Sequence, residues 1–96
     1  MEIEKYLLNK GIKPRYKGFA QLTYAIELCQ KEKTYLGNFT TRLYKDIARD
    51  FATLQGRVER DMRFALRSAG NKEKLSEFIS MAVFELKLSK EKGAKK

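Results

Sequence analysis

Residues 43–69 read LYKDIARDFATLQGRVERDMRFALRSA, and this stretch decides the fold. Leu43, Ile47 and Phe51 recur at steps of four, which predicts one buried stripe along a helix. A single residue separates Phe51 from Thr53, and a threonine in this position is typical of the N-cap of a following helix. Two helices joined so tightly must cross at a steep angle. The spacing therefore predicts a helix-turn-helix.

The second helix of this pair combines an apolar face with a basic face. Its predicted apolar positions are Leu54, Val58, Met62, Ala65, Leu66 and Ala69. At about 100° per residue, the opposite side carries Arg57, Arg60, Arg63 and Arg67. Arginine can donate two hydrogen bonds to guanine, and a carboxylate such as Glu59 can accept one from the cytosine amino group. We therefore predict that Arg57, Glu59 and Arg60 contact DNA bases, and that Arg67 flanks them. The alternative is an ordinary solvated basic face.

Helix starts supply the expected contacts to the DNA backbone. The first turn of a helix leaves N–H groups free and carries partial positive charge, so it suits a phosphate. This predicts contacts from Thr53, Gln55 and Gly56. Lys17 and Gly18 begin another predicted helix, and we expect them to approach a phosphate in the same way.

The rest of the chain also has helical spacing. Gly11 and Gly70 stand where helices are expected to end, and Thr40 is placed to cap the third helix, with Phe39 and Tyr44 spaced as a hydrophobic staple. The predicted helices cover residues 2–10, 18–32, about 40–51, 53–69 and 75–88. We expect an all-α protein, a compact bundle of about five helices. Residues 1–88 would form one helix-turn-helix DNA-binding domain, and residues 89–96 a disordered basic tail.

The composition limits which kinds of partner the protein can have and where in the cell it is expected. The formal net charge is +9, from 21 Lys and Arg against 12 Asp and Glu, which favours nucleic acid or an anionic membrane as partner. No apolar run approaches the roughly 20 residues that span a bilayer, and the start MEIEKYLL lacks the pattern of a secretion signal. We expect a cytoplasmic protein that does not bind membranes.

The absence of histidine and the single cysteine argue against an enzyme. Ser-His-Asp and Cys-His catalysis are excluded, and no zinc set of Cys and His ligands exists. Cys29 follows the apolar pattern of its helix and is expected to be buried. We therefore expect no catalytic residues, metal or cofactor.

From Ile3 to Ala69 the chain resembles the C-terminal DNA-binding domain of the stage-zero sporulation protein A family, the response regulators that start endospore formation. The resemblance is carried by Gly11-Ile12-Lys13-Pro14, Tyr16-Lys17-Gly18-Phe19, Leu36-Gly37, Thr41-Arg42-Leu43-Tyr44, Arg57-Val58-Glu59-Arg60 with Arg63, and Ser76-Glu77-Phe78-Ile79. It implies an effector domain that places its recognition helix in the major groove. Arg57, Glu59 and Arg60 would read bases, Arg63 would face DNA, and binding as a homodimer on tandem sites is implied.

The chain departs from this family in three places. It contains no receiver domain, it is shorter between Asn71 and Leu75, and Gly56 stands where the family tends to have serine. The shorter segment bears on the dimer contacts of the family. Glycine inside a helix also costs about 0.5 to 1 kcal/mol relative to alanine.

The residues and the family resemblance together leave two candidate functions, which belong to different classes. The first is a sequence-specific regulator of transcription that binds double-stranded DNA through residues 54–69. The second is a small protein-interaction module that pairs with a full-length relative without reading DNA. Further partners would be a full-length regulator or RNA polymerase. RNA binding is less favoured, because the aromatic residues mostly follow core spacing.

Overall fold

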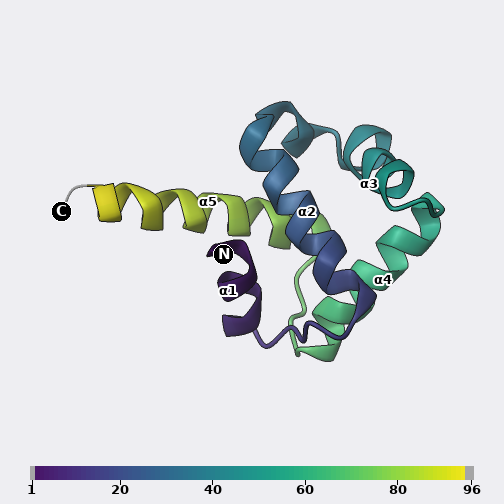
Figure 1. Ribbon diagram of the computed structural model, residues 1–96, viewed down its shortest axis with the longest axis horizontal. Helices are drawn as coiled ribbons and strands as arrows, with labels where there is room; N and C mark the ends of the chain where they lie inside the picture. Colours follow the sequence, from purple (N-terminus) through teal and green to yellow (C-terminus); the bar gives the residue numbers. More distant parts are fainter. Residues whose placement is uncertain (1, 95–96) are drawn as a thin grey trace.

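The computed structural model describes residues 2–94, which form helices and turns without a strand (Figure 1). The five α-helices are α1 (Glu2–Asn9), α2 (Lys17–Lys31), α3 (Tyr44–Asp50), α4 (Gln55–Ser68) and α5 (Leu75–Ala94). A 3₁₀ turn, η1 (Lys33–Gly37), and a π turn, η2 (Phe39–Leu43), join α2 to α3. The predicted all-α fold is confirmed.

Helix α2 lies at the centre of the molecule and contacts each of the other four α-helices (Figure 1). Most of the apolar positions predicted from spacing belong to the core around it. Side chains that are almost fully buried come from every α-helix and the adjoining turns: Leu7, Ile12, Leu22, Ile26, Leu43, Ile47, Met62, Leu66, Phe78 and Ile79. The 3.6-residue periodicity thus identified most of the inward positions, and the exceptions lie in the turn between α3 and α4.

Two glycines are required by their backbone conformation, and a third is required by a close contact between helices. Gly11 and Gly70 both have φ of +84° and follow the ends of α1 and α4, as predicted. Gly18 lies where α2 crosses α4. A Cβ atom at residue 18 would stand 2.8 Å from the carbonyl carbon of Asp61 and 2.9 Å from the Cβ of Ala65. The two helix backbones therefore touch, and only glycine fits between them.

The turn between α3 and α4 is longer than the sequence pattern predicted. Helix α3 ends at Asp50, and Ala52 adopts a left-handed conformation with φ of +54°. Thr53 does not cap α4. The N-cap is Leu54, without a side-chain hydrogen bond, while the Thr53 N–H donates to the Ala48 carbonyl at 2.9 Å.

Two apolar residues of this turn leave the stripes to which they were assigned. Phe51 is 38% exposed and Leu54 is 67% exposed. The predicted inward positions of both residues are therefore wrong. The reason is that both lie outside regular helix, so the helical step no longer sets their direction. Phe51 packs its ring against Tyr24 instead, with centroids 5.6 Å apart.

Two helix ends also differ from expectation. Thr40 lies inside η2 and is not an N-cap, although Phe39 and Tyr44 contact each other as predicted, with ring centroids 6.0 Å apart. Helix α5 continues past Leu88 to Ala94, so residues 89–94 are helical where a disordered tail was expected. Lysine, glutamate and alanine are good helix formers, which accounts for the extension. Lys95 and Lys96 lie outside the described residues.

Candidate nucleic-acid interface

Helix α4 is held by one face and exposed on the other. Val58, Met62, Ala65 and Leu66 are buried against the rest of the molecule, chiefly α2 and α3. The arginines at 57, 60, 63 and 67 are all exposed. The predicted division of this helix into an apolar and a basic face is therefore present in the structure.

Arg57 and Arg60 border a hollow of about 360 Å³ between the start of α2 and the start of α4. We call it the α2–α4 hollow, and its lining residues are Lys17, Ala20, Gln21, Phe51, Thr53, Arg57, Arg60 and Asp61. The Arg60 side chain is 72% exposed and lies 4.0 Å from the Asp61 carboxylate. Among the side chains of residues 2–90, Arg57 has no ion-pair partner, so its guanidinium is available to an outside acceptor. The structure thus brings Lys17 and Thr53, which were predicted to contact the DNA backbone, beside the two arginines that were predicted to contact bases.

Gln21 is a residue of this hollow that the sequence analysis missed. It is 4% exposed, and its Oε1 atom has no hydrogen-bond partner among the described residues. A buried amide that lacks a partner costs free energy unless something else supplies one. Its position three residues after Gly18 places it on the face of α2 that meets α4. The spacing from Gly18 to Gln21 could have identified Gln21 only if the crossing of α2 and α4 at Gly18 had been known.

Glu59 lies on the other flank of α4. Its carboxylate accepts a hydrogen bond from Gln55 Nε2 at 3.2 Å and pairs with Arg63 Nη2 at 3.7 Å. Gln55 also donates to the Thr40 carbonyl at 2.9 Å and so ties α4 to η2. Glu59 is therefore held in place, but apart from the hollow that Arg57 and Arg60 share.

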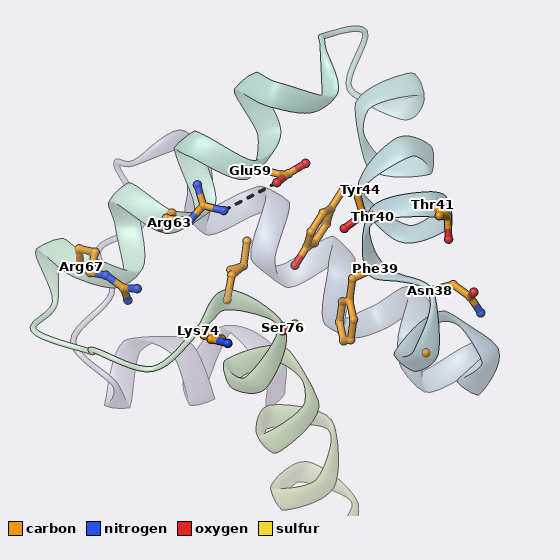
Figure 2. Close-up of a pocket in the computed structure, with 12 residues that line it drawn as sticks. Asn38, Phe39, Thr40, Thr41, Tyr44, Glu59, Arg63, Arg67, Lys74 and Ser76 are labelled. Carbon is orange, nitrogen blue, oxygen red and sulfur yellow. Dashed lines mark ion pairs between the residues drawn. The ribbon is translucent and has the colours of Figure 1, made fainter.

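Arg67 is occupied by its own loop. Its Nη1 atom donates to the carbonyl of Asn71 at 3.1 Å and to that of Glu73 at 2.9 Å. Together with Arg63 it borders a second hollow of about 520 Å³, which Figure 2 shows from the side of α5 and η2.

Four of the residues predicted to approach phosphates at helix starts differ in accessibility. Gly56 is exposed in the first turn of α4, and a Cβ there would meet nothing within 4 Å. The N–H groups of Gln55 and Gly56 precede the first hydrogen bond within α4, so they face outward unsatisfied by the helix. Lys17 is exposed, whereas Gly18 is buried against α4. Gly18 thus acts first as a crossing point between helices.

Phe64 is an apolar residue on the basic side of α4. It is 58% exposed on the basic side, and its ring meets the edge of Tyr16 with centroids 5.2 Å apart. Arg15 lies over the same tyrosine, 5.4 Å from the ring centroid. Phe64 therefore packs on the segment that precedes α2.

Other classes of site find no support in residues 2–94. Burial raises the pKa of the Cys29 thiol to about 11, so this cysteine is a buried apolar residue and a poor nucleophile. The described residues hold no cluster of three or more potential metal ligands. Across the same range, every helix is too short or too polar to cross a membrane.

A comparison with protein-family models agrees with the basic face of α4 and the helix-turn-helix that carries it. The matching model is described as sporulation initiation factor Spo0A C terminal, and it matches residues 3–95. This family is one of regulatory DNA-binding domains and not of enzymes. The match covers nearly the whole chain, including the shortened segment after Asn71. The chain therefore belongs to the C-terminal domain family of sporulation initiation factor Spo0A, a family of DNA-binding effector domains.

Proposed function

We propose that this chain is a sequence-specific regulator of transcription, of the sporulation-initiation type, which places α4 in the major groove of double-stranded DNA. The observation that carries the proposal is the exposure of Arg57 and Arg60 on the free face of α4, beside Lys17. A helix with side chains is about 10–12 Å wide, and the major groove is about 12 Å wide. Helix α4 lies along the edge of the molecule opposite the free end of α5, and its basic face is open to a duplex (Figure 1).

Each residue of the interface has a proposed role that follows from its chemistry. Arg57 and Arg60 donate paired hydrogen bonds to guanine, since both guanidinium groups point to solvent. Glu59 accepts from a cytosine amino group with the lone pairs that Gln55 and Arg63 leave free. The backbone is approached by Lys17 and Thr53 and by the free N–H groups of Gln55 and Gly56.

The proposal is tested by fluorescence anisotropy with two duplexes, one holding the sporulation-regulator box and one scrambled. Arg57→Ala and Arg60→Ala should each lose about 1 to 3 kcal/mol of binding free energy on the box and almost nothing on the scrambled duplex. Arg49→Ala is the matched control, because Arg49 lies on α3, pairs with Asp46 and Asp50, and borders neither hollow. Equal losses on both duplexes would rule out base reading.

The assembly that acts on DNA is also part of the proposal. We propose a homodimer on tandem sites that works in the cytoplasm with RNA polymerase or a full-length regulator, and membership of the family supports this assembly. Titration of a duplex with one site against a duplex with two sites would detect the dimer as cooperative binding.

One observation favours a second candidate, a protein-interaction module that pairs with a full-length relative. Helix α5 exposes Met81, Phe84 and Leu88 along one side, with exposed fractions of 50%, 55% and 44%. An apolar face of this kind suits a protein partner. If light scattering of the chain mixed with a full-length regulator shows no complex, this candidate is excluded.

A further inference from the structure

The second hollow lies on the flank of α4 away from Arg57. We call it the α4–α5 hollow. Its volume is about 520 Å³, and it is lined by Gly37, Asn38, Phe39, Thr40, Thr41, Tyr44, Glu59, Arg63, Arg67, Lys74, Leu75 and Ser76. In Figure 2, Arg63 and Arg67 project from α4 on one side, Lys74 lies below them, and Phe39 and Tyr44 form the opposite wall. Three elements that are distant in sequence therefore converge on one cationic space.

The charge of the α4–α5 hollow favours an anion. Arg63 offsets the only carboxylate of the lining, that of Glu59, at 3.7 Å. Arg67 and Lys74 remain as two positive charges without an ion-pair partner among the side chains of residues 2–90. Arg67 uses only Nη1 for the loop carbonyls, so its other N–H groups can still donate.

Hydroxyl groups complete the set of donors. Thr40, Thr41 and Ser76 line the same space, and each hydroxyl can donate one hydrogen bond. Guanidinium, ammonium and hydroxyl donors around one space are the combination that binds a phosphate group. The class of ligand is therefore a phosphate, either free or in a nucleic-acid backbone.

The position of the hollow on α4 distinguishes these two sources. Glu59, Arg63 and Arg67 follow one another at steps of four, so they share one flank of the helix. Arg57 borders the α2–α4 hollow on the other flank, and Arg60, which also borders that hollow, lies along the middle of the exposed face. A helix that lies in the major groove has the backbone of one DNA strand along each flank. The two hollows thus face opposite strands.

We propose that the α4–α5 hollow binds a backbone phosphate of the DNA strand opposite the one that Lys17 approaches, through Arg63, Arg67 and Lys74. This inference rests on the proposed placement of α4 in the major groove. It assigns a role in binding to Lys74, Thr40, Thr41 and Ser76, to which neither the sequence pattern nor the family match assigns one. The contact carries no base information, because phosphates are the same in every sequence.

The test compares Lys74→Ala with Lys72→Ala, a matched control two residues away that is exposed but does not line the hollow. Affinity for the box duplex and the scrambled duplex is measured over a series of salt concentrations. Lys74→Ala should make the slope of log K against log salt shallower by about one unit on both duplexes, and should preserve the preference for the box. The Lys72 variant should keep the slope of the unmodified chain. Equal slopes for the two variants would overturn the proposal.

A second arm locates the phosphate on the duplex. Methylphosphonate groups, which carry no charge, replace one phosphate at a time along each strand. One position should weaken binding of the unmodified chain and leave the Lys74→Ala variant unaffected, and it should lie on the strand opposite the position that does the same for Lys17→Ala. Both positions on one strand would overturn the proposal.

A third arm uses inorganic phosphate without DNA, followed by the NMR signals of Thr40, Lys74 and Ser76. Saturable shifts at millimolar phosphate that Lys74→Ala abolishes, together with an unchanged salt slope on DNA, would assign the hollow to a free anion and overturn the DNA proposal. Failure of the proposed function has a different signature. In that case the unmodified chain would not distinguish the box from the scrambled duplex, whatever Lys74 does.

Discussion

Gly18 is the single residue that sets how closely α2 approaches α4. No side chain fits between its Cα atom and the backbone of Asp61. The contact has consequences on both sides, because Lys17 and Gln21 adjoin it on α2 while Arg57 and Arg60 adjoin it on α4. The lack of a Cβ atom at Gly18 therefore lets α2 and α4 approach closely, and this approach sets the width of the α2–α4 hollow.

Gly18→Ala should lower the free energy of unfolding by about 1 to 3 kcal/mol, the usual cost of overpacking. The better helix propensity of alanine recovers only about 0.5 to 1 kcal/mol, so the clash decides the sign. Urea denaturation measures the change. Gly37→Ala is the control, since a Cβ at residue 37 meets nothing within 4 Å. An unchanged midpoint for Gly18→Ala would contradict the close crossing.

At the scale of elements, α4 is well packed along one face, but its first turn has few stabilising interactions. Its N-cap, Leu54, makes no side-chain hydrogen bond, and Gly56 follows two residues later. Both features weaken the start of the helix. Gln55, Gly56 and Arg57, which are among the residues proposed to touch DNA, therefore lie in a first turn that lacks these two sources of stability.

Gly56→Ala should raise the free energy of unfolding by about 0.5 to 1 kcal/mol, because the new methyl group enters open space while the backbone loses freedom only in the unfolded chain. Thermal unfolding by circular dichroism measures the gain. A lower melting temperature would show that residue 56 needs a conformation that alanine cannot adopt.

Element by element, the sequence predicted what depends on periodicity and missed what depends on tertiary contacts. The buried faces of α2, α4 and α5 follow from steps of three and four. The turn does not, because no pattern states that α3 stops at Asp50 or that Ala52 turns left-handed. In the site, Arg57 and Arg60 were visible on a helical wheel. Gln21 and Lys74 were not, since each joins its hollow only through the packing of distant elements.

At the scale of the whole molecule, α1 and α5 connect the two ends of the chain. The Tyr6 hydroxyl donates to Glu85 Oε1 at 2.6 Å, and Lys10 Nζ lies 3.9 Å from the same oxygen. The Tyr6 ring also contacts Phe78, with centroids 6.3 Å apart. Burial, followed by the Glu85 carboxylate, raises the pKa of Tyr6 above its ordinary value.

Tyr6→Phe should cost about 0.5 to 1.5 kcal/mol of stability, the net value of one hydrogen bond. The raised pKa means that this contribution is complete below the unfolded value of about 10 and is lost as the pH rises beyond it. Urea denaturation at pH 7 and above pH 10 measures both effects. A double-mutant cycle with Glu85→Gln isolates the pair, and full additivity would show that the two groups do not interact.

Helix α5 extends from the bundle and makes the molecule longest along one axis. The longest extent is 43 Å, and along that axis the end of α5 and the α3–α4 turn lie at opposite extremes (Figure 1). A fluorophore on α5 near Lys90 would thus lie far from a duplex bound at α4. Energy transfer from such a fluorophore to dyes at either end of an asymmetric site would report which way round the protein sits on DNA. The elongated shape of the molecule thus makes the orientation of the protein on a promoter measurable.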